Sequence, residues 1–506
     1  MGAGVRPRSA GARSAGARGA SPALALLLAV LLALLLVVGL PDAAGGQPAG
    51  AAAAAPGARR PMVVLVAIDG LRPEYVLDAD RWGARVPTLR RFVREGAHAS
   101  GVVGVVPTLT YPSHATLLTG VAPARHGILS NTTFDPLRRN ADGWYWYASD
   151  LRVPTLWDAA AAAGLGTASL HFPVSVGAPV RWLVPQLWRT GTADDRKLVR
   201  ALSTPGLLDT LEAALGPYAD GIDESLAGDE TRGRFAVAML ERLRPDLATF
   251  YLTALDHEQH EAGPGSAAAI AVLERLDAVL GRIVEAARRA SGGHAVVAVV
   301  SDHGFLPVTH EVHLGARLAA EGLVTLADSG ERVTDWRAAA WNAGGSAAIV
   351  LRDSADAATR RRVAALLGAL AADPASGIAR VLDAPALAAR GGFPGAAFLV
   401  DLAPGYTTGG RLRGPLVTPS ARRGMHGHLP DRPELRAAFL ALGAGVAPGR
   451  ALGVIDMRDV APTLARVLRV ALPTAEGRAH ALGELRPTAR RATPAAARQP
   501  ARRGAR

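Results

Sequence analysis

Short, continuous apolar runs alternate along the chain with longer amphipathic stretches. Unbroken Val-, Leu- and Ala-rich runs of this length indicate strands that are buried on both faces. They are MVVLVAIDG (62–70), GTASLHF (166–172), LATFYLTALD (247–256) and HAVVAVVSDHG (294–304). Stretches such as SAAAIAVLERLDAVLGRIVEAARRA have the spacing of helices. The alternation predicts an α/β fold with a mainly parallel central sheet covered by helices on both faces.

A later segment, 343–410, has a pattern of its own. It reads as strand, helix, strand and strand, with SAAIVLR, DAATRRRVAALLGALAAD, GIARVLD and AAFLVDL in that order. This order predicts a small inserted α/β subdomain. No internal repeat is evident.

The N-terminus has the order of segments that is typical of an export signal. Four arginines precede an apolar run from Ala23 to Leu40, and small residues follow. We assign 1–44 to a signal peptide or N-terminal membrane anchor, and we favour export with cleavage near 43–46. Residues 45–60 read as a linker and 486–506 as a disordered basic tail. The body is therefore expected in the periplasm or outside the cell.

The formal charge of +12 is concentrated in the two ends of the chain. Residues 1–60 contain six Arg and one Asp, and residues 471–506 contain eight Arg and two Glu, which leaves the body close to neutral. A neutral body argues against a groove that binds nucleic acid specifically. The chain has no cysteine, so any metal must be held by nitrogen and oxygen ligands.

Acidic residues stand at the ends of three predicted strands. Ligands of an open α/β sheet gather at the carboxyl ends of its strands, so these acids should lie together. Histidines follow two of them closely, and GMHGH supplies another later in the chain. The set can hold two divalent ions, and Asp and His ligands favour zinc, although other divalent metals remain compatible. It comprises Asp69, Asp256, His260, Asp302, His303 and His426. Four nearby histidines remain alternative ligands: His257, His310, His313 and His428.

The stretch VVPTLTYPSHATLLTG (105–120) places a threonine directly before Tyr111-Pro112. A turn uses Pro and Ser, but it does not need Thr110 at that position. We interpret Thr110 as a nucleophile at the mouth of a helix that begins near Ser113. The amino end of such a helix favours an anion.

These motifs, in this order, resemble the type I phosphodiesterase/nucleotide pyrophosphatase family of the alkaline phosphatase superfamily, in a bacterial-type form. The resemblance runs from about Met62 to Arg478 and defines a catalytic domain over 61–478. It rests on VAIDGLRPEY, PTLTYPSHATLLTGVAPARHGILSN, YLTALDHEQHEAGP, SDHGF, GMHG and DMRDVAPTLARVLRVALPTAEGR. It implies an alkaline phosphatase-like three-layer sandwich.

The resemblance also implies roles for individual residues. One zinc would be held by Asp69, Thr110, Asp302 and His303, and the second by Asp256, His260 and His426. Thr110 would attack phosphorus and form a phosphothreonine, which water then hydrolyses. The substrate would be a small phosphate ester with a phosphodiester or pyrophosphate bond.

Two further positions are expected to contact substrate. Family members usually have Asn three residues after the nucleophile, and here that place is taken by Ser113, whose hydroxyl can still donate a hydrogen bond. Tyr111 fits the aromatic position that lines the leaving-group pocket, with simple packing as its alternative role.

Other functions fit the sequence less well. A phosphomonoesterase or phosphonate hydrolase could use the same site, but monoesters usually need an additional Arg or Lys, which the sequence does not place. A sulfatase has a Cys- or Ser-x-Pro-x-Arg motif whose first residue is oxidised, but here Thr110 takes the first position and His114 the place of the Arg. A binding module without catalysis would normally lack a nucleophile or a ligand.

Overall fold

The computed structural model describes residues 60–140 and 143–483. The predicted signal or anchor segment (1–44), all but the last residue of the predicted linker (45–60) and the predicted basic tail (486–506) lie outside these residues. Among the helices of the described ranges, none combines the length and apolar character that a membrane crossing requires.

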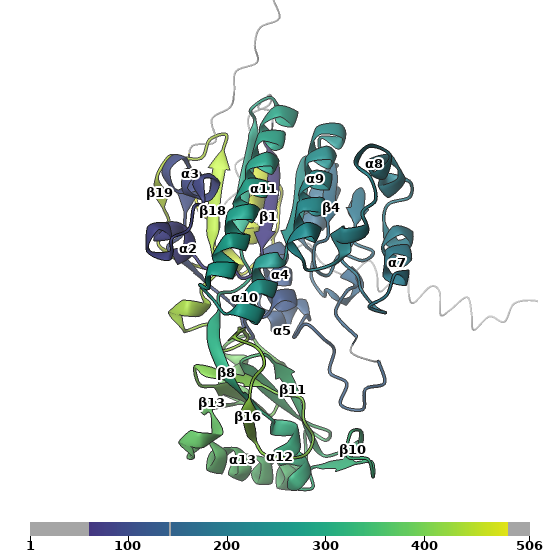
Figure 1. Ribbon diagram of the computed structural model, residues 1–506, viewed down its shortest axis with the longest axis vertical. Coiled ribbons are helices and arrows are strands. Elements are labelled where there is room, and N and C mark those ends of the chain that lie inside the picture. The colour runs from purple at the N-terminus through teal and green to yellow at the C-terminus, as the bar shows by residue number, and fades with distance from the viewer. Residues whose placement is uncertain (1–59, 141–142, 484–506) are drawn as a thin grey trace, which may run out of the picture. The chain divides into compact units, whose positions relative to one another are not determined.

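A mainly parallel sheet of eight strands forms the centre of the fold (Figure 1). Strand β18 is antiparallel to its two neighbours, and the other neighbouring pairs are parallel. In spatial order the strands are β19 (Arg450–Ala451), β2 (Ala97–His98), β18 (Phe439–Gly443), β7 (Ala295–Val300), β1 (Met62–Ile68), β6 (Leu247–Leu252), β4 (Thr167–Leu170) and β5 (Trp182–Val184).

Helices cover both faces of this sheet. On β1 the side chains of Val64 and Val66 enter one apolar cluster, and those of Val63 and Leu65 enter another. The alternation of a strand sends successive side chains to opposite faces, so the two clusters define three layers. The first cluster contains residues of α3 (Pro87–Glu95), α9 (Leu226–Leu243) and α11 (Ala267–Ser291); the second contains residues of α4 (Thr110–Thr119), α6 (Leu156–Ala162) and α15 (Val460–Leu468).

Further α-helices flank this core. They are α2 (Glu74–Leu77), α5 (Pro123–His126), α7 (Asp194–Leu202), α8 (Leu207–Leu215) and α10 (Ala254–Ala262).

The predicted strand over 247–256 is too long. Strand β6 ends at Leu252, and α10 begins at Ala254. The cause is a cap, because the carboxylate of Asp229 accepts the backbone N–H groups of Thr253 and Ala254. Asp256 therefore lies in the first turn of a helix rather than at the end of a strand.

A second, antiparallel sheet follows the order β11-β12-β14-β13 and has its own apolar cluster (Figure 1). It begins at Ala338, ahead of the predicted start of the inserted subdomain at residue 343. Its elements are β11 (Ala338–Ala343), β12 (Ser346–Leu351), α13 (Ala357–Ala371), β13 (Ile378–Asp383), α14 (Ala384–Ala388) and β14 (Phe398–Leu402).

The other described strands and the helix α12 lie outside these two sheets. Strand β8 pairs in parallel with β15 and antiparallel with β16 and β17. The elements are β8 (Leu306–Val312), α12 (Leu314–Ala320), β9 (Val324–Leu326), β10 (Val333–Trp336), β15 (Gly405–Thr408), β16 (Val417–Pro419), β17 (Gly424–Met425), and a separate pair, β3 (Gly101–Val103) with β20 (Val454–Asp456).

Candidate active site

Three neighbouring strands bring the predicted ligands to one edge of the central sheet. Strand β1 lies between β6 and β7 and is parallel to both, so their carboxyl ends meet. Asp69 follows β1, Asp302 and His303 follow β7, and Asp256 lies at the start of α10 after β6.

The first ligand group consists of Asp69, Asp302 and His303. One donor atom from each lies within 4.8 Å of the other two. The Nε2 atom of His303 is 3.3 Å from Oδ1 of Asp69 and 3.2 Å from Oδ2 of Asp302. All three side chains are buried.

Hydrogen bonds orient these three side chains. One atom of each that could bind a metal has no hydrogen-bond partner. The Tyr251 hydroxyl donates to Oδ2 of Asp69, and the Gly70 N–H donates to Oδ1 of Asp302 at 3.2 Å. His303 pairs through Nδ1 with the carbonyl of the next residue at 3.2 Å. The atoms left over are Asp69 Oδ1, Asp302 Oδ2 and His303 Nε2. Such outer hydrogen bonds are typical of metal ligands.

A second group adds Asp256 and His426 and shares His303 with the first. Nε2 of His426 is 3.5 Å from Oδ1 of Asp256, and Nε2 of His260 is 3.4 Å from Oδ2 of Asp256. Asp256 and His260 stand four residues apart on α10, so they share one face of the helix. His303 and His426 stack with ring centroids 3.5 Å apart.

His426, and His260 beside the second group, are oriented in the same way. Nδ1 of His426 bonds to the carbonyl of Thr108 at 2.9 Å, and Nδ1 of His260 bonds to the carbonyl of Gly424 at 2.9 Å. In each ring this bond leaves Nε2 directed at Asp256.

The electrostatics of the site fit divalent cations. Burial, followed by the charges of Asp256 and Asp302, raises the pKa of Asp69 well above its usual range. Burial raises the pKa of Asp302 to about 7. Burial also lowers the pKa of His303 well below its usual range, which keeps the ring neutral. Crowded carboxylates with neutral imidazoles form an oxygen and nitrogen donor set that suits zinc and similar ions.

Thr110 is the first residue of α4 and lines a cavity of about 910 Å³ together with Asp69, Asp256 and His426. The helix therefore begins at the predicted nucleophile rather than near Ser113. Its first turn offers fewer free N–H groups than expected, because Pro112 has none and the Tyr111 N–H donates to Oδ1 of Asn131 at 3.0 Å. What remains for an anion is mainly the helix dipole.

Thr108 connects the nucleophile segment to the segment that carries His426. Its carbonyl bonds to Nδ1 of His426, its hydroxyl donates to the carbonyl of His428 at 2.8 Å, and it accepts the N–H of Gly427 at 3.0 Å. These three bonds fix His426 relative to the start of α4.

Ser113, which was predicted to contact substrate, does not reach the cavity. Ser113 is completely buried, and it does not line the cavity. Asn131 does line it, beside Thr110. Asn131 lies within the stretch that carries the family resemblance, but its role depends on a fold that returns it to the start of α4, so local spacing gave no signal.

Tyr111 both lines the cavity and packs beneath it. Its hydroxyl donates to Oε1 of Gln186 at 2.9 Å, and its ring meets the ring of Trp144 edge-on with centroids 5.3 Å apart. Trp144 and Trp188 extend this aromatic wall of the cavity.

A buried ion pair lies behind α10. Nε of Arg232 donates to Oδ1 of Asp229 at 2.8 Å, and neither residue is exposed to solvent by more than 1%. Arg232 also donates to the carbonyls of Gly221 and Asp223, and Asp223 lines the cavity. The pair thus connects the start of α10, which carries Asp256, to another wall of the same cavity.

The four alternative histidines lie outside both ligand groups. His313 bonds to the Thr418 hydroxyl at 2.9 Å, His428 to the carbonyl of Tyr406 at 3.1 Å, and His310 to the hydroxyl of Thr309 at 2.8 Å. His257 lies 3.8 Å from Glu224.

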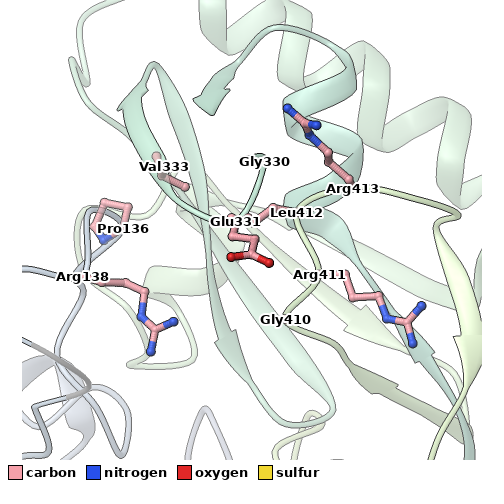
Figure 2. Close-up of a pocket in the computed structure, with 9 residues that line it drawn as sticks. All are labelled: Pro136, Arg138, Gly330, Glu331, Val333, Gly410, Arg411, Leu412 and Arg413. Atoms are coloured by element: carbon pink, nitrogen blue, oxygen red, sulfur yellow. The ribbon is translucent and has the colours of Figure 1, made fainter. Parts of the chain in front are cut away.

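A second cavity, of about 390 Å³, lies beside the β9–β10 hairpin and includes Arg138, Arg411 and Arg413 in its lining. Figure 2 shows that the guanidinium groups of these arginines spread apart around it rather than meeting at one point. Glu331 lies among them, so the cavity is not built as a single anion site.

The fold matches that of solved ectonucleotide pyrophosphatases/phosphodiesterases. An inactive variant of murine family member 5, in complex with AMP, aligns with a TM-score of 0.57 at 17% identity over 82% of this chain and 97% of its own. Human family member 5 gives a TM-score of 0.55. The fold class is therefore α/β and alkaline phosphatase-like, as predicted.

Sequence comparison identifies the family. The model of the type I phosphodiesterase/nucleotide pyrophosphatase family matches residues 63–387. The chain therefore belongs to this family, as the motifs predicted. Rat ectonucleotide pyrophosphatase/phosphodiesterase family member 3 is 26% identical over 49% of this chain and 25% of its own length. A venom phosphodiesterase of Crotalus durissus collilineatus is 25% identical over 49% of this chain and 26% of its own length. The chain thus spans only about a quarter of the length of these relatives.

Proposed function

We propose that the protein is an exported two-metal hydrolase that cleaves phosphodiester or pyrophosphate bonds of nucleotide-like substrates. The observation that carries the proposal is the meeting of Thr110 with Asp69, Asp256 and His426 in one cavity. Membership of the phosphodiesterase family supports it, as does the AMP bound to the murine relative of the same fold.

Two zinc ions are the proposed cofactors. One would be held by Asp69, Thr110, Asp302 and His303, and the other by Asp256, His260 and His426. His303 has donor contacts to both groups. Zinc would act as a Lewis acid that lowers the cost of an alkoxide on the nucleophile and neutralises charge on the phosphoryl oxygens.

Thr110 itself carries out the displacement at phosphorus. The Thr110 Oγ atom forms a bond to phosphorus as the bond to the leaving oxygen breaks, and the leaving oxygen takes the electron pair. The hydroxyl proton passes to solvent. Water then attacks the phosphorus of the phosphothreonine, the bond to the Thr110 oxygen breaks, the nucleoside monophosphate leaves, and a proton from the water restores the hydroxyl.

Asn131 takes the role predicted for Ser113. Its Oδ1 atom is occupied by the Tyr111 N–H, so the amide is held with its NH₂ group available as a donor beside Thr110. A preorganised amide donor stabilises negative charge as it develops on a phosphoryl oxygen.

The test compares p-nitrophenyl thymidine monophosphate, a diester, with p-nitrophenyl phosphate, a monoester. We expect faster hydrolysis of the diester, complete loss on chelation and recovery with zinc. Thr110→Ala should abolish turnover, and acid quenching of the wild type should trap phosphate on Thr110 by mass spectrometry. Turnover by Thr110→Ala at the wild-type rate would contradict the covalent mechanism. Preference for the monoester would indicate a phosphatase instead.

A further inference from the structure

Arg422 lines the catalytic cavity and has no assigned task. It is exposed and lies between β16 and β17, in the segment that leads to His426. Among the residues that the structure describes, none forms a hydrogen bond or an ion pair with its guanidinium. A cation in a cavity with no protein partner is available to a ligand.

The backbone around Arg422 is held in place. The Arg422 N–H donates to the hydroxyl of Ser420 at 3.1 Å, and the N–H of Ser420 donates to the carbonyl of Thr309 at 2.9 Å. On the other side, the N–H of Arg423 donates to the carbonyl of His260 at 2.8 Å. The origin of the side chain is therefore fixed next to the end of α10.

This position puts Arg422 on one side of the reaction centre. It is near enough for its charge to act on Asp256, His260 and His426. In the proposed mechanism Thr110 belongs to the opposite ligand set, with Asp69 and Asp302. An in-line displacement expels the leaving oxygen on the side away from the nucleophile. The proposed mechanism therefore assigns the leaving oxygen to the side of Asp256, His260 and His426, and Arg422 lies beside these residues in the cavity lining.

The cavity lining also includes acids, which make a cation there significant, and a second exposed cation, Arg196. Asp223 and Glu224 also line the cavity, and the Glu224 carboxylate lies 3.8 Å from Nδ1 of His257. These acids would repel an anionic leaving group. A guanidinium can bind phosphate oxygens through two parallel N–H bonds, which offsets that repulsion.

We propose that Arg422 binds an anionic group on the leaving portion of the substrate and so selects substrates whose leaving group carries phosphate. The inference rests on the proposed function and gives it a substrate class: nucleoside polyphosphates and related pyrophosphates are preferred over esters with an uncharged leaving group. A solvent-exposed contact of this kind is worth up to about fivefold in rate, and it weakens with added salt.

The experiment uses two substrates that transfer the same thymidine monophosphate. Thymidine triphosphate releases pyrophosphate, and p-nitrophenyl thymidine monophosphate releases p-nitrophenol. We expect Arg422→Gln to lower kcat/KM about fivefold for the triphosphate and less than about twofold for the aryl ester. Arg422→Lys should recover part of the loss. Arg423→Gln is the matched control, because its side chain does not line the cavity.

The outcomes separate this inference from the function it rests on. Hydrolysis of neither substrate by the wild type would refute the proposed function and the inference with it. Hydrolysis of both, with equal losses or none in Arg422→Gln, would overturn the inference alone. A larger loss for the aryl ester than for the triphosphate would also overturn it, because Arg422 would then not act on a charged leaving group.

Discussion

The lining of the catalytic cavity has two unlike parts. The buried part comprises Asp69, Thr110, Tyr251 and His426. Hydrogen bonds orient the side chains of Asp69, Tyr251 and His426, and the carbonyl of Thr110 bonds to Nδ1 of His114. The exposed part (Arg196, Glu224 and Arg422) has few protein partners. Under the proposed function the difference separates two tasks: buried, oriented groups would supply the chemistry, and exposed groups would change the choice of substrate without disturbing it.

The strongest test of the buried part is Asp302→Asn. It removes one of three crowded carboxylates from the ligand groups, so we expect kcat/KM to fall by roughly a thousandfold or more. The chelated protein should become more stable, by about 1 to 3 kcal/mol, because repulsion among buried acids is relieved. Hydrolysis of the diester measures the first effect, and melting temperatures with chelator and with zinc measure the second. A variant that zinc stabilises as much as the wild type would contradict the ligand assignment.

The next test concerns the buried ion pair between Asp229 and Arg232, which lies behind α10. Asp229→Ala leaves the buried guanidinium of Arg232 without its carboxylate, so the free energy of unfolding should fall by about 3 to 5 kcal/mol. The matched control is Asp209→Ala, which breaks the ion pair with Arg200 on the surface and should cost less than about 1 kcal/mol. Urea unfolding measures both. Equal losses would show that burial of the first pair does not matter.

A smaller effect distinguishes Asn131 from Ser113. Asn131→Ala removes an amide donor beside the nucleophile and should lower kcat roughly a hundredfold. Ser113→Ala removes a buried hydroxyl that has no hydrogen-bond partner, so kcat should change by less than about twofold. Diester hydrolysis measures both variants. The reverse order would restore the substrate contact first predicted for Ser113.

The smallest predicted effect comes from His126, a buried residue that is hydrogen-bonded to Thr116 of α4. The free energy of unfolding should depend on pH through this histidine. Its Nδ1 accepts the N–H of Ile128 at 3.1 Å, so Nε2 carries the proton and donates to the Thr116 hydroxyl at 3.0 Å. Burial lowers the pKa of His126 from 6.5 to about 3. Between these values the unfolded chain binds a proton that the folded chain does not, so acidification destabilises the fold.

This group contributes up to about 1.4 kcal/mol per pH unit in that window, and its contribution to stability is complete above it. His126→Gln should lower the slope of unfolding free energy against pH between 6 and 4 by about this amount. Urea unfolding of both proteins in chelator measures it. Parallel slopes would contradict the assignment of a neutral, buried ring.

The sequence predicted the parts of the site that follow from local pattern. Continuous apolar runs located β1 and β7, and the residues directly after them, Asp69 and Asp302, lie where the end of a parallel sheet must place them. Asp256 was placed wrongly on a strand, because the cap that starts α10 comes from Asp229, far earlier in the chain. Tertiary capping of this kind leaves no local signature.

Other residues of the cavity could not be found in this way. Asn131 and Arg422 reach the site through loops whose course is set by distant packing. Ser113 illustrates the opposite error: a suitable chemical group at a suitable spacing faces the interior, because the first turn of α4 directs it there. The proposed split of ligands between two metals also depends on His303, whose membership of both ligand groups only three-dimensional geometry defines.

The bond between Thr108 and His426 has a consequence for the order of events during synthesis. The two residues are 318 positions apart. At typical rates of translation that separation corresponds to roughly 15 to 60 seconds. A nascent chain that has emerged only as far as β8 carries the nucleophile and most of the acids but lacks His426. Until the ribosome delivers that histidine, the growing chain can present only the first ligand group.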